Sequence, residues 1–268
     1  MIAYYSVAAR QEFWAEHWGQ HSVGELLALA RTSPLTDLIT CALPPPPSVV
    51  LEAGCGAGQY VVLLRERGWC ALGADWSVDA LVECRRVAPV PLAGMDLSAL
   101  AVREGALAAY ISLGVIEHDA AGPDAILAEA RRVLAPSGAL IVSVPYINGV
   151  RRLGAFLIRR RQRALAARGA SFYQYAFSRR ELRAALARHG FRTVTVSPYG
   201  PGYYLSKLLS RRLQPRRGVV PGASSSASSL GAPPRRALRR RIGRALLYSD
   251  PSLRLFGHML LVVARRTP

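Results

Sequence analysis

The stretch VLEAGCGAGQY, residues 49–59, places three glycines, Gly54, Gly56 and Gly58, between two apolar runs. Glycine adopts positive φ angles and lets a ligand approach the backbone where a Cβ atom would obstruct it. The pattern therefore predicts a strand, a glycine-rich turn and a helix, which together suit a small cofactor. The dinucleotide fingerprint GxGxxG, counted from Gly54, needs a small residue at position 59, and Gln59 stands there. The spacing therefore disfavours a nicotinamide dinucleotide.

Two carboxylates follow the glycines, each at the end of an apolar run. Asp75 ends CALGAD, seventeen residues after Gly58, and Asp96 lies in GMDL after the next short run. Asp75 can accept hydrogen bonds from two vicinal ribose hydroxyls, and Asp96 can accept one from an exocyclic amine. Because parallel strands end at one edge of a sheet, the glycines and both carboxylates should line one crevice.

The elements that must position these residues alternate along the chain. Helical patterns occur at 60–67, 78–86 and 123–134, and strand patterns occur at 49–52, 70–75, 90–94, 108–113, 139–144, 191–197 and 258–266. This rhythm is typical of an α/β fold with a doubly wound, Rossmann-like, mostly parallel seven-stranded sheet covered by helices on both faces. We expect four parts: a helical N-terminal cap (1–47), a core (48–199) with an arginine-rich helical insertion (148–177), a basic, partly disordered insertion (200–257) and a final core strand (258–268).

Two helix starts carry a capping signal. Ser22 with Glu25, and Ser178 with Glu181, have the spacing of a capping box. In this motif the side chain of each residue accepts a hydrogen bond from the backbone amide of the other. We therefore expect helices to begin directly after both serines.

Five stretches together make the sequence resemble the class I S-adenosylmethionine-dependent methyltransferases: VLEAGCGAGQY, GADWS, GMDL, ISLGVIEHD and EARRVLAPSGALIVSVP. The resemblance is strongest to the small-molecule branch, which includes methyltransferases of quinone biosynthesis and of sugars or lipids. The sequence departs from the family at Ala108, where an aspartate often precedes the fourth strand. The resemblance implies S-adenosylmethionine as cofactor, with Glu52, Gly54, Gly56 and Gly58 around its methionine part, Asp75 on the ribose, Trp76 against the adenine, and Asp96 and Leu97 on the adenine amine and ring.

The implied cofactor also fixes the class of reaction. Its sulfonium already activates the methyl group, so the enzyme mainly aligns an acceptor. His118, in IEHD at the expected sheet edge, is the candidate general base for a hydroxyl acceptor, with Glu117 orienting it; a purely structural role for the pair is the alternative. The sequence predicts O-methylation of a small lipid-, quinone- or glycan-type acceptor. The alternatives are an RNA-binding methyltransferase and a non-catalytic cofactor-binding protein.

The charge of the chain is unevenly distributed. Residues 1–149 carry 9 arginines against 15 acidic residues, a net charge of −6, whereas residues 150–268 carry 26 basic residues against two acidic ones, a net charge of +24. Within the basic half, residues 235–247 combine arginines with apolar residues on one helical face. Such a helix suits an anionic membrane surface; a solvated face or a nucleic-acid partner is the alternative.

Cysteine usage and hydropathy set the remaining expectations. Cys41, Cys55, Cys70 and Cys84 lie 14, 15 and 14 residues apart, which matches no zinc-site spacing, so we expect reduced, buried, structural cysteines and no metal. The sequence shows no leader pattern and no run of about 18 apolar residues. We expect a cytoplasmic protein that residues 235–247 could attach to the inner face of the membrane.

Overall fold

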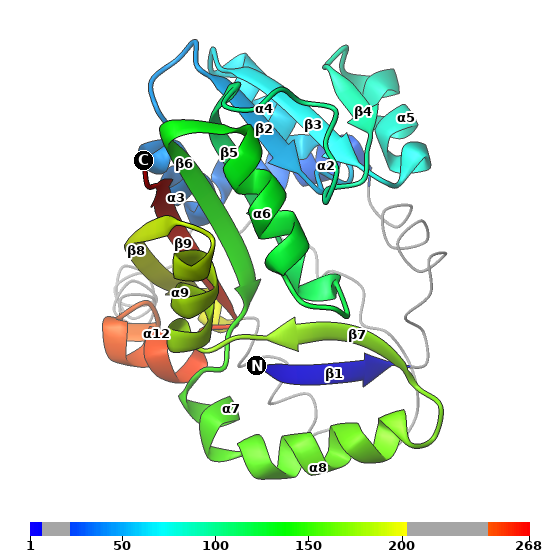
Figure 1. The fold of residues 1–268 in the computed structure, drawn as a ribbon, viewed down its shortest axis with the longest axis vertical. Helices are drawn as coiled ribbons and strands as arrows, with labels where there is room; N and C mark the ends of the chain where they lie inside the picture. The colour runs from blue at the N-terminus through cyan, green and yellow to red at the C-terminus, as the bar shows by residue number, and fades with distance from the viewer. Residues whose placement is uncertain (7–21, 203–245) are drawn as a thin grey trace, which may run out of the picture.

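The structure, a computed structural model, describes residues 1–6, 22–202 and 246–268 (Figure 1). Its main sheet has seven strands in the order β4-β3-β2-β5-β6-β9-β8, and a second sheet pairs β1 with β7. The strands are β1 (Ile2–Ser6), β2 (Val49–Ala53), β3 (Cys70–Asp75), β4 (Leu92–Gly94), β5 (Leu107–Leu113), β6 (Leu134–Pro145), β7 (Ser171–Ala176), β8 (Phe191–Tyr199) and β9 (Met259–Arg266).

The main sheet is parallel from β4 to β6 and antiparallel at one side. The pairs β3–β4, β2–β3, β2–β5 and β5–β6 are parallel, whereas β9 runs antiparallel to both of its neighbours, β6 and β8. The predicted doubly wound, mostly parallel seven-stranded sheet is thus confirmed. Because the parallel strands share one direction, the loops after β2, β3 and β5 meet at a single edge of the sheet.

Helices cover both faces of the sheet. The helices are α2 (Val23–Thr32), α3 (Pro34–Ala42), α4 (Gln59–Glu66), α5 (Val78–Val87), a 3-10 turn η1 (Ile116–His118), α6 (Asp124–Val133), α7 (Gly149–Leu153), α8 (Ala155–Ala166), α9 (Arg179–Arg188) and α12 (Asp250–Phe256). Side chains from α2 to α5 pack on one face, and those of α6 and α9 pack on the other.

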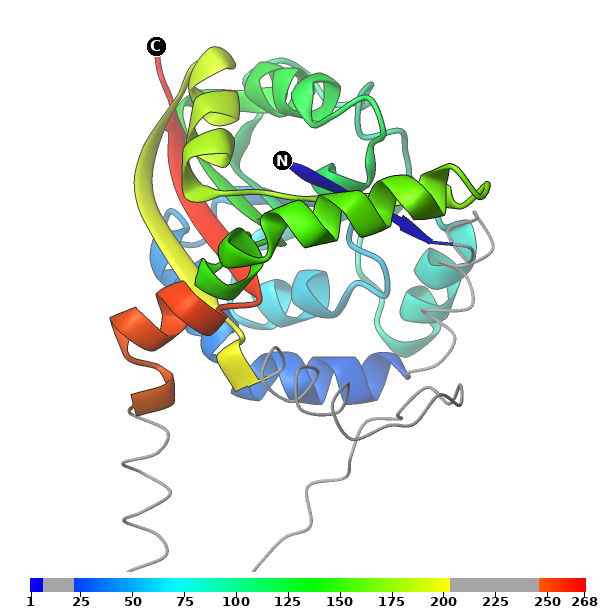
Figure 2. The ribbon, with the colours of Figure 1, turned by 90° about the horizontal axis from the view of Figure 1, so that it is seen from below.

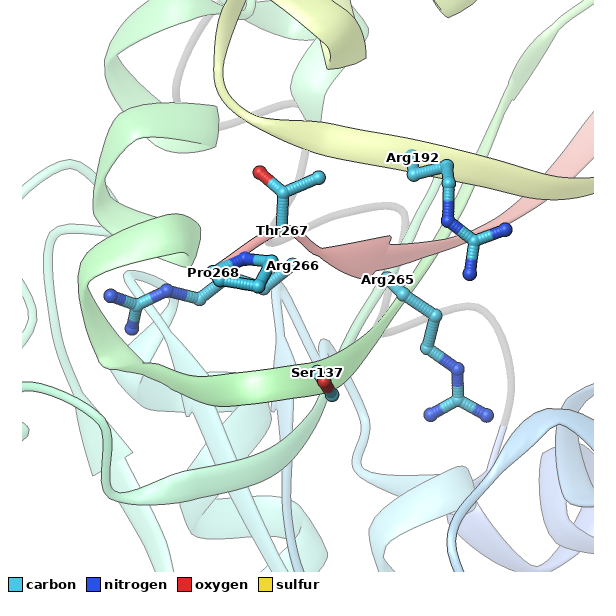
Figure 3. A pocket seen from close by; sticks show the side chains of 6 residues that line it. All are labelled: Ser137, Arg192, Arg265, Arg266, Thr267 and Pro268. Atoms are coloured by element: carbon cyan, nitrogen blue, oxygen red, sulfur yellow. The ribbon is translucent and has the colours of Figure 1, made fainter.

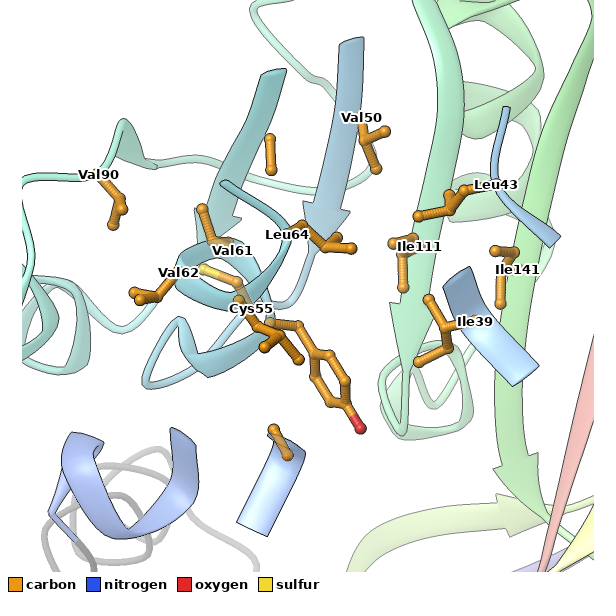
Figure 4. Close-up of a cluster of buried hydrophobic side chains, with 14 of the residues drawn as sticks. Ile39, Leu43, Val50, Cys55, Val61, Val62, Leu64, Val90, Ile111 and Ile141 are labelled. Carbon is orange, nitrogen blue, oxygen red and sulfur yellow. The ribbon is translucent and has the colours of Figure 1, made fainter. Parts of the chain in front are cut away.

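The strand sequences explain why both faces are apolar. Val50 of β2 joins the core beneath α4, and the next residue, Leu51, joins the core beneath α6, because successive side chains point to opposite faces. Figure 4 shows the first of these cores, with Val61 and Leu64 of α4 among its members. Strands buried on both sides therefore appear in the sequence as nearly continuous apolar runs.

Both predicted capping boxes are present. The Ser22 hydroxyl accepts from the Glu25 amide and the Glu25 carboxylate accepts from the Ser22 amide, and Ser178 and Glu181 form the same reciprocal pair. Helices α2 and α9 begin directly after these serines, as predicted.

Two helical expectations are wrong in part. Residues 2–6, expected in a helical cap, form β1, and residues 171–176, expected within the helical insertion, form β7, its antiparallel partner. Both strands are rich in aromatic residues, which favour a pleated and half-buried surface. Helix α8 packs across β1, as the view in Figure 2 shows. The insertion is therefore a helix laid on a two-stranded sheet.

The structure also bears on the expectations for the cysteines and the basic segment. Cys55 and Cys84 are buried, but the expectation of four buried cysteines is wrong because Cys41 and Cys70 are exposed; all four are free thiols. Of the basic segment 235–247, residues 235–245 lie outside the described part of the chain. Within the described ranges no helix has the length and apolar content needed to span a membrane.

Gly73 in the middle of β3 gives a test of the packing between the sheet and α4. A Cβ atom at this position would lie 2.5 Å from Leu92 Cδ2 and 2.9 Å from Val61 Cγ2, so Gly73→Ala should overpack the core and lower the free energy of unfolding by about 1–3 kcal/mol in urea denaturation. Gly24→Ala on α2, where a Cβ meets no atom within 4 Å, should leave that free energy unchanged or raise it by up to about 1 kcal/mol. Equal stability of the two variants would contradict the packing described.

Candidate active site

The glycine loop after β2 is tied to the end of β3. The amides of Gly54 and Cys55 donate to the Ala74 carbonyl oxygen at N···O distances of 2.7 and 3.1 Å, and the Gly56 amide donates to Asp75 Oδ2 at 2.7 Å. The Gly58 amide donates to the Cys55 carbonyl oxygen at 2.8 Å. A pyrophosphate would need such amides for itself, so the loop is not built as a phosphate cradle.

Packing requires two of these glycines. Gly54 and Gly58 have φ angles of 77° and 69°. A Cβ atom would lie 2.3 Å from Val115 Cγ2 at Gly54 and 2.6 Å from Cys84 Sγ at Gly58. The loop therefore has to be glycine-rich in order to close against the neighbouring β5 loop and α5.

A cleft of about 490 Å³ opens at this edge of the sheet, a volume that suits a small molecule. Five of the residues singled out in the sequence line it: Gly54, Asp75, Trp76, Leu97 and His118. The remaining lining residues are Leu113, Gly114, Val115, Asp119 and Ile126. Most of these residues belong to the stretch ISLGVIEHD, which the sequence predicts at the sheet edge. The sequence predicts a role only for the glutamate and the histidine of this stretch.

Four predicted residues lie beside the cleft without lining it. Gly56 and Gly58 shape the loop, and Glu52 is buried at the end of β2. Asp96 is exposed, and its Oδ1 accepts from the amide and the hydroxyl of Ser98 at 2.8 and 2.7 Å, which lower its pKa. Asp96 thus stands next to Leu97 at the rim of the cleft.

Two buried carboxyl groups lie close to this edge, and among the described residues neither has an arginine or lysine partner. Glu52 Oε2 and Glu117 Oε2 have no hydrogen-bond partner within the described ranges. Burial raises the pKa of Glu117 to about 8, and burial together with the charge of Asp75 raises that of Glu52. A Cβ atom on Gly114, which lines the cleft, would lie 3.7 Å from Glu117 Oε1. Glu117 therefore lies directly behind the lining.

His118 is oriented by the backbone of β7. Its Nδ1 lies 2.7 Å from the carbonyl oxygen of Tyr173, and its ring packs edge-on against the Tyr173 ring. A carbonyl oxygen only accepts, so Nδ1 carries the hydrogen and Nε2 of the neutral ring carries the lone pair. Burial lowers the pKa of His118, partly offset by the Tyr173 carbonyl. The expectation that Glu117 orients this ring is wrong, because Glu117 Oε1 lies 4.0 Å from Nε2, beyond hydrogen-bond range.

A second hollow lies at the opposite end of the sheet and shares no residue with the cleft. Arg192 of β8 and Arg265 of β9 are direct cross-strand partners there, with Arg266 and Ser137 nearby (Figure 3). None of the predicted site residues lies in it. Within the residues that the structure describes, no group of three or more histidine, cysteine or acidic side chains could hold a metal ion.

Several solved structures have a fold similar to that of this chain. A structure of an S-adenosylmethionine-dependent methyltransferase from Mesorhizobium loti is 16% identical, with a TM-score of 0.56, over 88% of this chain and 99% of its own. One from Archaeoglobus fulgidus is 17% identical, with a TM-score of 0.57, over 96% and 100%. A geranyl diphosphate methyltransferase, in complex with GPP and sinefungin, is 18% identical, with a TM-score of 0.56, over 86% and 76%. No curated protein sequence matches the chain.

The family match covers the site as well as the fold. The sequence profile of a family described as a methyltransferase domain matches residues 27–196, more than half of the chain, which includes the glycine loop, Asp75 and His118. The chain therefore belongs to this methyltransferase family, as a class I enzyme whose methyl donor is S-adenosylmethionine.

Proposed function

We propose that this methyltransferase acts on a hydroxyl group of a small acceptor of the lipid, quinone or glycan type, with His118 as the general base. The observation that carries the proposal is that a neutral histidine, fixed by a backbone carbonyl, lines the same cleft as Asp75 and the glycine loop. When bound, S-adenosylmethionine supplies a methyl group that its sulfonium has already activated.

The residues around the cleft fit this cofactor. S-adenosylmethionine carries a sulfonium and an ammonium group, and the buried carboxyl groups of Glu52 and Glu117 suit a positively charged ligand because both have an oxygen without a partner in the described chain. The loop amides donate to protein acceptors, which suits a cofactor that lacks phosphate.

We assign the nucleoside part of the cofactor to the other side of the glycine loop. Asp75 accepts one backbone amide on each carboxylate oxygen, from Gly56 and Ser77, and each oxygen retains a lone pair for a ribose hydroxyl. Trp76 is half exposed at the cleft, where its ring can cover the adenine, with Leu97 and Asp96 on the adenine ring and amine.

The surroundings of His118 favour an apolar acceptor. The Tyr173 ring packs against the histidine ring. On the same strand, β7, and on its partner β1, further aromatic rings form a row, with ring centroids 6.1 Å apart for Tyr5 and Phe172 and 4.7 Å for Phe172 and Tyr175. Such rings offer large apolar area with polar tips. The geranyl diphosphate methyltransferase of similar fold is consistent with an isoprenoid-like acceptor. Incubating the enzyme and the cofactor with lipid and metabolite extracts should yield a product heavier by one methyl group in mass spectrometry; acceptors that lack a hydroxyl would contradict the assignment.

Replacement of Asp75 tests the ribose assignment. Asp75→Ala leaves two hydroxyls without a charged acceptor, so the affinity for S-adenosylmethionine should fall by about 1.5–3 kcal/mol, that is, roughly 10- to 150-fold, in isothermal titration calorimetry. Asp79→Ala on the exposed start of α5 is the matched control and should bind like the wild type. Wild-type affinity of the Asp75 variant, or heat on adding NAD, would contradict the assignment.

The raised pKa of Glu117 makes cofactor affinity depend on pH. A bound cation favours the ionised carboxylate, so binding releases a proton, and affinity should rise by up to about tenfold per pH unit as the pH approaches about 8, then level off. Glu117→Gln should remove the part of this rise that levels off near pH 8, whereas the surface variant Glu66→Gln should keep it. Dividing wild-type by variant affinity at each pH cancels the ionisation of the ligand itself. A constant ratio would contradict contact between Glu117 and the cofactor.

Replacement of His118 tests the base. His118→Gln should lower the turnover number about 10²- to 10⁴-fold with an acceptor found in the screen, while cofactor affinity stays within a few-fold. Wild-type activity should fall at low pH as the ring becomes protonated, at a pH below 6.5 because burial lowers its pKa. His189→Gln, which changes a histidine that pairs with Asp124 outside the cleft, is the matched control. A loss below a few-fold would assign His118 to the structure of the loop.

A further inference from the structure

Three large apolar side chains are exposed to solvent where α7 meets α8. Leu153, Phe156 and Leu157 are 88%, 74% and 67% exposed. The spacing of i, i+3 and i+4 places them side by side across the junction at Gly154. Three adjacent exposed side chains of this size are unusual on a protein surface and mark an interaction site.

These side chains are not a loose part of the core. The inner face of α8 is already packed, because Ala155 and Ile158 contact the small cluster that contains Ile2. Gln162 on the same inner face accepts the Tyr5 amide at 2.8 Å through its Oε1. The outer face of α7 and α8 thus remains apolar although the helix is anchored.

The same outer face carries strong positive charge. Residues 148–180 contain no aspartate or glutamate. Within the described chain, the exposed guanidinium groups of Arg152, Arg160 and Arg161 take part in no ion pair. The partner of this face must therefore offer apolar volume and negative charge together.

The face is connected to the cleft through two layers of structure. Helix α8 packs on β1, and β1 pairs with β7 (Figures 1 and 2). On β7, the Tyr173 carbonyl holds His118, and the Tyr175 hydroxyl donates to the Ala120 carbonyl oxygen at 2.9 Å. A surface that bound the outer face of α8 would thus lie one helix and one thin sheet away from the loop that carries His118.

We propose that the outer face of α7 and α8 docks on an anionic lipid bilayer. Leu153, Phe156 and Leu157 enter the boundary between headgroups and acyl chains, and the arginines around them contact lipid phosphates. A bilayer surface supplies both chemistries, whereas RNA would satisfy the arginines but leave the two leucines in water. The surface is independent of which acceptor is methylated.

A neighbouring helix, α12, packs against α7 and also carries exposed leucines. Leu255 of α12 lies against α7, so close that a Cβ atom on Gly149 would be 2.6 Å from its Cδ2. Leu246 and Leu255 are exposed large apolar residues. The basic segment 235–247 ends in the described chain at Leu246 and Leu247, two residues before the cap of α12. The segment joins α12 in the chain and is the competing source of membrane affinity that the experiment has to separate.

Vesicle co-sedimentation of the full chain tests the proposal. The wild type should pellet with phosphatidylglycerol vesicles and at least about tenfold less with phosphatidylcholine vesicles. The triple variant Arg152→Gln, Arg160→Gln, Arg161→Gln should weaken binding at least about tenfold. The matched control Arg67→Gln, Arg86→Gln, Arg103→Gln removes the same charge from the end of α4, from α5 and from the turn before β5, on the far side of the molecule from α7 and α8 (Figure 1), and should bind within about twofold of the wild type. The variant Leu153→Ala, Phe156→Ala, Leu157→Ala should lose the part of the binding that persists at high salt.

Insertion can be measured at single positions. A tryptophan introduced by Phe156→Trp should be quenched by brominated lipid beyond the wild-type background, whereas one introduced by Leu29→Trp, at an exposed position of α2, should not. Thermal melting of each variant checks that its fold is intact. The proposal is overturned if the wild type does not pellet, or if only a variant with Arg239, Arg240, Arg241 and Arg244 changed to glutamine loses binding. It is equally overturned if the α7–α8 variants lose affinity for single-stranded RNA but not for vesicles.

Discussion

The carboxylate of Asp75 holds together the two turns on which the cleft is built. Its Oδ2 accepts the amide of Gly56 in the turn after β2, and its Oδ1 accepts the amide of Ser77 in the turn after β3. The Ala74 carbonyl reinforces the junction by accepting the amides of Gly54 and Cys55. Because the two strands are neighbours and parallel, this junction fixes the glycine loop, the rim at Trp76 and the approach to the β5 loop in a single geometry.

Two carboxyl groups are buried in the interior behind this junction. Glu52 and Glu117 are buried with raised pKa values, and each has an oxygen that finds no partner in the described chain. Burying a carboxyl group whose oxygen has no partner lowers the free energy of unfolding. Such groups with shifted pKa values cluster at functional sites. A cationic ligand in contact with these carboxyl groups would stabilise their ionised form, which is why we propose that they link cofactor binding to the protonation state of the protein.

The acidic and the basic half of the chain form different parts of the fold. The acidic half of the chain forms the parallel strands and the loops of the cleft, and the basic half contributes α7, α8 and the antiparallel side of the sheet. Strands buried on both faces have little room for charge, so charged residues of either sign lie mostly on elements with a free outer face. Helix α8 has such a face because only one side of it packs on β1.

Sequence alone determined the features that depend on local chemistry. The glycine spacing, the carboxylate at the end of β3, the alternation of strands and helices and both capping boxes follow from neighbouring residues, so the parallel core and its cofactor edge were predictable. The contacts that complete the site join distant segments: the Tyr173 carbonyl orients His118, and β1 pairs with β7. The tertiary structure also decided that β9 lies between β6 and β8 and that Cys41 and Cys70 are exposed. A backbone carbonyl has no signature in the sequence, and strand pairing depends on how the whole chain shares its buried surface, so only the folded protein settles these contacts.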